Sequence, residues 1–424
     1  RCAMTELTGT MRLVRLAVRR DRVRLPVWLA VLTLLNYVTA ASTVGLYASE
    51  ADRVKFAVAS TKSPVVLAFN GLVTGPSLGE VVASQDLLPL LVGAALVSTF
   101  AVVRHTRQNE ETGRAEMIGS AIVGRYALLA AAVLVAIGAN LVLGAVTALV
   151  LVASGLPVAG SVASGAAVAL VGIAFAALAA LLAQLPESAR AANGLAAAAV
   201  GVAFLLRAVG DVTGSVTDNE TNVHSGFLSW LSPIGWGQQI RPYDDNAWWV
   251  LVLPVLFAVA CAAGAAAILA SRDLGAGLMP SHPGPGAASR GLMGPVGLAW
   301  RLQRGSFYGW AAGLAVVSAT YGAIGNQIDD FLSSSQEVSD YVSEFGGGSG
   351  SLTDGYFAYT FAFLGLAVAG YVVQALLRTR SEETGPLENV LATAVSRPRW
   401  LASHVTVAVL GAVDLLLLCG LATG

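Results

Sequence analysis

Lysine is almost absent from this 424-residue chain, which carries it at Lys55 and Lys62 only. A phosphate-binding loop of the form G-x-x-x-x-G-K-[ST] requires a lysine directly after a glycine, whereas Val54 and Thr61 precede these two. Cysteine occurs three times at distant positions, and the four histidines form no H-x-x-x-H pair. The sequence therefore predicts no ATP-binding loop, no disulfide framework, no metal site and no cofactor bound by this chain.

Charge is scarce as well, because charged residues make up 12% of the chain, against about 25% in a typical soluble domain. Apolar runs of roughly 20 residues, the length of a helix that crosses a bilayer, recur along the whole chain. These runs lack the alternating pattern of a membrane β-barrel strand. The predicted fold class is therefore an all-α polytopic membrane protein.

Apolar runs between clusters of charge define nine predicted membrane spans. With the N-terminus inside, 20 of the 25 Lys and Arg residues fall on the cytoplasmic side, in agreement with the positive-inside rule. Few lysines beside many Ala, Gly, Val and Arg residues indicate a GC-rich bacterial genome. We therefore expect a multi-pass protein of the bacterial cell membrane with a cytoplasmic N-terminus. The predicted spans are Leu25–Tyr47, Leu87–Val103, Tyr126–Ser154, Gly160–Gln184, Ala191–Ala208, Trp249–Ala270, Phe307–Ile328, Tyr356–Leu377 and Leu401–Leu421.

A tandem repeat divides the chain. Positions 110–125 and 382–397 share seven of sixteen residues at a constant offset of 272, and both copies begin with Glu-Glu-Thr-Gly. The second copy stops after its third span, so the sequence looks incomplete at its C-terminus, and we expect about twelve spans in the complete protein. The predicted organisation is a basic amphipathic segment (1–24), a first six-span unit (25–270), a flexible Pro/Gly-rich linker (271–297) and a second unit (298–424).

The repeated loops are the candidate site of contact with a soluble partner. Gly113 and Gly385 suit the N-cap of a short helix, and Glu116 and Glu388 then lie in its first turn, where a carboxylate meets free N–H groups. Each helix is predicted to carry one apolar stripe, Met117 to Ile122 in the first loop, which fits a groove of a partner protein. The alternative is that the stripe lies in the lipid headgroup layer, but the paired glutamates favour docking. The candidate coupling residues are Glu110, Glu111, Gly113, Glu116, Arg125, Glu382, Glu383, Gly385, Glu388 and Arg397.

Two features outside these loops are candidate transport residues. Trp230, Ser232, Pro233 and Trp236 in an external loop form either an external gate or an interfacial anchor. Asp414 interrupts the last span and is expected to face protein or a cavity, as a pathway residue or as a helix-packing contact. Its conceivable partners are Arg207, Asn36 and Gln374.

The N-terminal stretch Met11–Arg24 alternates arginines with apolar residues. This pattern is typical of an amphipathic helix on the inner membrane surface, and it equally suits charge that only sets the topology. The pattern alone does not assign the segment a function.

The motifs of both units together resemble a known family, the duplicated permeases of actinobacterial ABC exporters for polyketide antibiotics, the tetronasin-resistance type. The resemblance covers nearly the whole chain and rests on the two Glu-Glu-Thr-Gly loops and on Trp230–Trp236, Arg272–Leu278 and Gly297–Gly305. It implies a permease, not itself an enzyme, that exports hydrophobic small molecules with energy from a separate ATPase subunit. Two copies of that ATPase subunit would bind the ATP and Mg, and each copy would contact one of the two loops.

The main alternative class is a proton-coupled secondary carrier, which also has about twelve spans in two halves. Against it, ionisable residues inside the spans are nearly absent, and the loops lack the Gly-x-x-x-Asp-Arg-x-Gly pattern typical of the major facilitator family. A non-transporting structural membrane subunit is a second alternative. No pairing of nucleophile and base is visible, so an intramembrane enzyme is not predicted, and no nucleic acid is expected as a partner.

Overall fold

The computed structural model describes residues 6–217, 219–273, 275–279, 287, 290–292, 294–325, 352–383 and 387–424. These residues are helical almost throughout, and they include a short antiparallel hairpin of β1 (Ser215–Val216) and β2 (Val223–His224). The chain forms two compact units, unit 1 (Arg1–His282) and unit 2 (Pro283–Gly424). The boundary between the units lies within the segment predicted as the linker.

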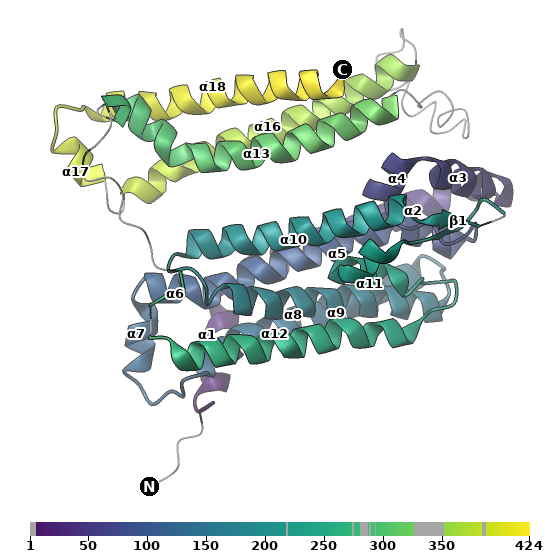
Figure 1. The fold of residues 1–424 in the computed structure, drawn as a ribbon, viewed down its shortest axis with the longest axis horizontal. Helices are drawn as coiled ribbons and strands as arrows, with labels where there is room; N and C mark the ends of the chain where they lie inside the picture. The colour runs from purple at the N-terminus through teal and green to yellow at the C-terminus, as the bar shows by residue number, and fades with distance from the viewer. Residues whose placement is uncertain are drawn as a thin grey trace. The chain divides into compact units, whose positions relative to one another are not determined.

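The long helices of unit 1 lie side by side along a common direction (Figure 1). They are α2 (Arg24–Leu46), α5 (Leu78–His105), α8 (Ala127–Ala153), α9 (Val158–Leu182), α10 (Ala189–Val212) and α12 (Val252–Ser271). One end of this bundle, the α6–α7 end, carries α1 (Thr10–Arg20), α6 (Arg107–Glu111) and α7 (Arg114–Gly119). The opposite end, the α3–α4 end, carries the hairpin, α3 (Glu50–Lys62), α4 (Pro64–Phe69), α11 (Pro233–Gln239) and the 3-10 helices η1 (Phe227–Leu231) and η2 (Trp248–Leu251).

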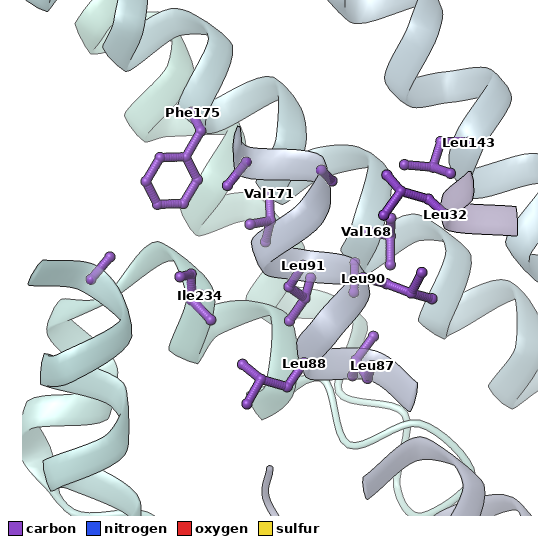
Figure 2. Close-up of a cluster of buried hydrophobic side chains, with 14 of the residues drawn as sticks. Leu32, Leu87, Leu88, Leu90, Leu91, Leu143, Val168, Val171, Phe175 and Ile234 are labelled. Atoms are coloured by element: carbon purple, nitrogen blue, oxygen red, sulfur yellow. The ribbon is translucent and has the colours of Figure 1, made fainter. Parts of the chain in front are cut away.

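The core of unit 1 is built around α5, whose buried leucines meet side chains of the neighbouring helices (Figure 2). Helices α8 and α9 approach backbone to backbone, because a Cβ atom on Gly144 would lie 2.3 Å from the carbonyl oxygen of Gly165. Small residues allow membrane helices to pack this closely. The labelled core residues are Leu32, Leu87, Leu88, Leu90, Leu91, Leu143, Val168, Val171, Phe175 and Ile234.

The described part of unit 2 contains three long helices, α13 (Pro295–Gly325), α16 (Leu352–Glu383) and α18 (Arg397–Thr423), together with α17 (Leu387–Leu391) and the 3-10 helix η3 (Arg290–Leu292). Helix α18 packs against both α13 and α16. Their shared core includes Leu314, Leu364, Tyr371 and Leu415. Unit 2 therefore has an apolar core of its own.

Eight helical segments of the described residues are long and apolar enough to cross a membrane, which confirms the all-α polytopic fold. All eight overlap predicted spans. The remaining predicted span, Phe307–Ile328, overlaps α13, which is not among the eight, and its residues 326–328 lie outside the described part of the chain. The eight segments are Arg24–Leu46, Leu78–Glu111, Ala127–Ala153, Val158–Leu182, Ala189–Val212, Trp248–Ser271, Thr360–Arg380 and Arg397–Thr423.

The second span begins earlier than the sequence analysis predicted. The prediction started at Leu87, whereas α5 starts at Leu78, with Ser77 and Glu80 forming a reciprocal capping box. The polar residues in the first turns of α5 hid this start from a search for apolar runs. As a result Asp86 lies inside the helix, where it is 3% exposed.

Candidate functional site

The first predicted coupling loop lies at the α6–α7 end, and Glu110 is buried within it. Arg272, which follows α12, donates two hydrogen bonds to the Glu110 carboxylate, from Nη2 to Oε1 at 2.7 Å and from Nη1 to Oε2 at 3.0 Å. Arg107 donates a third from Nη1 to Oε2 at 2.8 Å. The side chains of Arg107, Glu110 and Arg272 are 0%, 8% and 3% exposed, and we call them the Glu110 cluster. In this position the Glu110 carboxylate holds the loop in place.

The Glu110 cluster also joins α6 to α9 and to the segment that follows α12. Arg107 Nε donates to the carbonyl oxygen of Ala183 at 2.9 Å, and Arg272 Nε donates to Gln184 Oε1 at 2.8 Å. Arg272 Nη1 donates to the carbonyl oxygen of Ala276 at 2.7 Å. A displacement of α6 would therefore act on α9 and α12 together.

Glu111, the neighbour of Glu110, contacts a different helix. Its Oε2 accepts a hydrogen bond at 2.9 Å from the backbone N–H of Ala189, the first residue of α10. A carboxylate at this position satisfies a free N–H group and complements the positive end of the helix dipole. The two adjacent glutamates thus tie one short loop to two spans.

Arg125 contacts the C-terminal end of α12, the end that Arg272 follows. Its Nη2 donates to the carbonyl oxygens of Leu269 and Ala270 at 2.9 and 2.7 Å, in the last turn of that helix. These carbonyls have no partner within the helix, so a cation there is favourable. Arg125 and Arg272 thus both fix the end of α12 to the predicted coupling loop.

The predicted short helix after Gly113 exists in the first loop. Gly113 adopts a left-handed conformation, with φ +71°, at the N-cap of α7, and Glu116 is exposed in the first turn. In this conformation a residue with a side chain is strained, so the glycine has a specific role.

The predicted apolar stripe of α7 is wrong as a single face. The helix ends at Gly119, and Ile118 packs with Leu13 of α1 and with side chains of α8. Met117 and Ile122 are 70% and 75% exposed. The helix is too short to carry a stripe of two turns, so its apolar residues divide between the protein and the surface.

The second predicted coupling loop follows α16 in unit 2. Glu382 is buried, at 7% exposure, and its carboxylate lies 3.3 Å from His404 Nε2 of α18 and 3.6 Å from Arg378 Nε. Glu382 thus also holds its loop, although its partners differ in kind from those of Glu110. Glu383 is the last residue of α16, and Gly385 lies outside the described residues.

A hollow of about 640 Å³ lies between α17 and α18. Glu388, in the first turn of α17, and Arg397, the first residue of α18, are exposed and line it together with apolar side chains. The apolar lining residues are Leu387, Leu391, Pro398, Trp400 and Leu401. An apolar hollow with one acid and one base suits the side chains of an amphipathic helix.

The tryptophan motif at the α3–α4 end forms a buried element. Ser232 caps α11 by accepting from Gly235 N, and its hydroxyl donates to the carbonyl oxygen of Ala203 in α10 at 2.6 Å. Pro233 occupies the first position of α11, where no N–H is needed. Helix α11 contacts α5, α9 and α10. The motif therefore reaches into the bundle, deeper than an interfacial belt.

The two tryptophans of this motif lie at its outer side. Trp236 Nε1 donates to the carbonyl oxygen of Trp230 at 2.6 Å, and the Trp230 ring stacks on that of Trp249 with centroids 5.8 Å apart. Trp249 is 62% exposed at the start of the sixth span. The motif thus pairs an aromatic stack that reaches the surface with a short helix packed against α5, α9 and α10.

Asp414 lies on the surface of α18 in unit 2 and is exposed. That Asp414 faces protein or a cavity stays a prediction. Its conceivable partners are engaged elsewhere, since Asn36 donates to Asp86 at 2.5 Å, Arg207 to Asp211 at 3.2 Å and Trp310 to Gln374 at 2.5 Å.

The sequence analysis missed two buried ionic groups at the ends of spans. Asp21, between α1 and α2, lies 2.9 Å from Arg104 Nη2 and 2.6 Å from His105 Nε2 at the end of α5. At the opposite end of the bundle, Arg207 of α10 donates to Asp211 and to carbonyl oxygens at the end of α4. No local pattern signals the Asp21 group, because its partners come from a separate segment. Arg207 and Asp211, in contrast, are four residues apart on α10, so their spacing was a readable signal of an ion pair.

The described residues contain no cluster of three or more His, Cys, Asp or Glu side chains placed to hold a metal ion. The charged contacts of unit 1 instead join helix ends to one another. Such a framework suits a protein that moves whole helices.

Comparisons with known proteins agree with this architecture. Residues 292–424 match the family described as "Multidrug efflux system permease Rv1217c, C-terminal domain". The chain is 42% identical to the multidrug efflux system permease protein Rv1217c of Mycobacterium tuberculosis over an alignment of 420 residues. The alignment covers 98% of this chain and 74% of that protein. The chain therefore belongs to the family of the multidrug efflux system permease Rv1217c.

Proposed function

We propose that this chain is the membrane-spanning subunit of an ATP-driven ABC exporter in the bacterial cell membrane, with the α6–α7 end in the cytoplasm. It moves hydrophobic small molecules, of the drug or polyketide-antibiotic class, outward. A separate ATPase subunit, in two copies, binds the ATP and Mg and supplies the energy. Two observations support the assignment of transport to this chain and of ATP binding to another subunit. The chain belongs to an efflux permease family, and it lacks a phosphate-binding lysine.

One observation carries the proposal, namely that α7 presents exposed side chains on a loop that is fixed to several spans. Glu116 and Met117 are exposed on α7. The Glu110 cluster connects this loop to α9 and α12, and Glu111 connects it to α10. A force on α7 reaches α6 through Thr112 and Gly113, and the contacts of α6 pass it to three spans.

The coupling is proposed to work through these contacts. Closure of the ATPase pair pushes on α7 in unit 1 and on α17 in unit 2, and the spans tied to these loops move as rigid bodies. The buried Glu110 and Glu382 act as positioning residues in this scheme. Glu116, Glu388 and the hollow beside α17 supply the contact with the ATPase.

A matched pair of methionines tests this assignment. Met117 of α7 and Met11 of α1 are 70% and 75% exposed, so a charge at either position costs little inside the protein. We expect Met117→Glu to reduce copurification of the ATPase at least about tenfold, the equivalent of 1.4 kcal/mol, and Met11→Glu to leave it unchanged. ATP-driven efflux of ethidium from proteoliposomes should fall with Met117→Glu and stay unchanged with Met11→Glu.

The proposal fails if both methionine variants retain the ATPase and transport equally well. It also fails if transport follows a proton gradient in the absence of any ATPase. Both variants should show the same yield and elution profile in detergent, which separates a docking defect from misfolding.

The structure favours one second candidate, the proton-coupled carrier, through a single buried acid. Asp86 in α5 is 3% exposed and its Oδ2 accepts from Asn36 Nδ2 of α2 at 2.5 Å. Ionisable residues inside spans commonly serve proton transfer. In a carrier, Asp86→Asn would abolish transport driven by a proton gradient, whereas we expect it to leave ATP-driven transport intact.

A further inference from the structure

Positive charge gathers where α1 meets α2, next to the ends of α5 and α7. Arg20 lies within electrostatic range of Arg114 and Arg24, and Arg104 lies within range of Arg20 and Arg24. We call Arg20, Arg24, Arg104 and Arg114 the arginine junction. Like charges this close repel one another unless an anion compensates them.

The described acid among the charged neighbours of Arg20 and Arg104 is Asp21. Asp21 is 1% exposed and is already bound to Arg104 at 2.9 Å and to His105 at 2.6 Å. Around Arg20 and Arg104, positive charges therefore outnumber negative ones. Burial, with Arg114 and Arg24 nearby, lowers the pKa of Arg20, as expected where positive charge exceeds negative charge.

The junction cannot relax by moving α1 away from its neighbours. Leu13 and Ala17 of α1 are buried, and Leu13 packs with Ile118 of α7 and with Ala127 and Ala131 of α8. Arg20 Nη1 donates to Asn109 Oδ1 of α6 at 2.6 Å, which leaves further N–H groups of its guanidinium for another acceptor. The arginines are thus held together by apolar packing.

A small hollow of about 40 Å³ adjoins Arg20. Its wall combines the polar side chains of Arg20, His105 and Asn109 with apolar ones, among them Leu16 and Leu128. Such a mixed wall suits a molecule that joins a charged group to hydrocarbon. A soluble anion would gain nothing from the apolar part.

Exposed apolar side chains surround the junction on the α1–α2 segment. Leu16, Val18 and Val23 are 54%, 51% and 63% exposed, and the first span starts at Arg24. The arginines therefore lie at the level where hydrocarbon gives way to headgroups, with apolar side chains ready to enter the acyl layer.

We propose that the arginine junction binds the headgroup phosphate of an anionic phospholipid, with Arg20 and Arg114 as its direct ligands. Arg24 and Arg104 supply the surrounding positive charge, and Leu16 contacts the first carbons of the acyl chains. Guanidinium groups recognise phosphate through paired hydrogen bonds, and basic side chains at the membrane surface attract anionic lipids. The bound lipid holds α1 against the α6–α7 loop.

The test is binding of phosphatidylglycerol to the purified full chain in detergent, measured by native mass spectrometry and compared with phosphatidylcholine. We expect retention of phosphatidylglycerol and not of phosphatidylcholine. Arg114→Gln should weaken the retention about fivefold, and Arg20→Gln with Arg114→Gln more than tenfold. Arg12→Gln is the matched control, because Arg12 is an exposed arginine of the same helix two turns away from the junction.

Three results would overturn the proposal. The first is equal retention of both lipids, and the second is an equal loss with Arg12→Gln, which would indicate only diffuse surface charge. The third is displacement of phosphatidylglycerol by millimolar inorganic phosphate, which would indicate a site for a soluble anion. Because Arg114 is exposed, its variant should fold normally, and an unchanged thermal midpoint confirms this. The outcome is independent of the ATPase, so it does not depend on the proposed function.

Discussion

Glu110 and Arg272 are 162 residues apart in the chain, yet their side chains meet in a two-point ion pair at 2.7 and 3.0 Å. The pair joins the loop after the second span to the end of the sixth span of unit 1. Glu111, next in the chain, makes a single hydrogen bond to the start of α10. Glu110 therefore makes a strong buried contact, and its neighbour Glu111 makes a weaker contact at a helix end.

The first prediction compares three glutamates of this loop. Glu110→Ala leaves two buried arginines without their carboxylate and should destabilise the protein by about 3–5 kcal/mol. Glu111→Ala removes one contact at a helix N-terminus and should cost about 1 kcal/mol. The exposed Glu116→Ala should cost nothing measurable.

Thermal unfolding of the three variants in one detergent measures this order. Equal shifts of the midpoint for Glu110→Ala and Glu111→Ala would contradict the structural role of the Glu110 cluster. A loss of ATPase copurification with Glu116→Ala at unchanged stability would instead locate a docking contact.

The spans were predictable from sequence because each depends on a strong local signal, a run of apolar residues long enough to cross a bilayer. The start of α5 was missed for the same reason. Asp86 is tolerated inside that helix because Asn36, 50 residues earlier in the chain, donates to it. A contact of this kind depends on the fold and leaves no local trace.

The candidate loops were predictable as loops, but the role of each residue in them was not. The repeat singled out Glu110, and the family resemblance singled out the segment that begins with Arg272. Neither observation showed that the two residues pair. The exposure of Glu116 and the burial of the Glu110 side chain depend on how the side chains of α6 meet the ends of α9 and α12, which the sequence pattern does not contain.

The second prediction concerns the glycine that starts α7. Gly113 has φ +71° with open space around it, so Gly113→Ala meets no neighbouring atom but adopts a strained backbone. The expected cost is about 1–2 kcal/mol. Gly119→Ala is the control, since Gly119 is the last helical residue of α7 and has nothing within 4 Å of an added Cβ atom, so alanine should stabilise the helix by up to about 1 kcal/mol. A lower thermal midpoint for Gly113→Ala together with a higher one for Gly119→Ala supports the left-handed role of Gly113. Midpoint shifts of the same sign contradict it.

The third prediction concerns the tryptophan motif. A Cβ atom on Gly235 of α11 would lie 2.0 Å from the carbonyl oxygen of Ser229, so Gly235→Ala must displace backbone. We expect a loss of about 1–3 kcal/mol or more. Gly201→Ala in α10, with nothing within 4 Å, should be tolerated. Similar folded yields of the two variants from membranes would show that α11 is not packed as described.

Tyr243 occupies a narrow space at the α3–α4 end. Its ring lies between Gly79 and Gly160, where added Cβ atoms would be 2.4 and 2.2 Å from ring carbons. Its hydroxyl lies 3.0 Å from Ser161 Oγ, and its backbone is left-handed, with φ +69°. Tyr243 keeps this strained backbone conformation because the packing of its ring between Gly79 and Gly160 strongly favours it.

The fourth prediction follows from the ionisation of Tyr243. Burial, opposed by the hydrogen bond with Ser161, raises the pKa of Tyr243 to about 12 from its usual value of 10.0. The folded protein thus retains the phenolic proton that the unfolded chain releases near pH 10. The associated stability is complete below pH 10 and is lost as the pH rises toward 12, by an amount on the order of 2 kcal/mol. Tyr243→Phe keeps the ring but cannot titrate, so the difference in unfolding free energy between the wild type and this variant should shrink across that interval. A constant difference from pH 9 to pH 12 would show that the hydroxyl is not buried against Ser161.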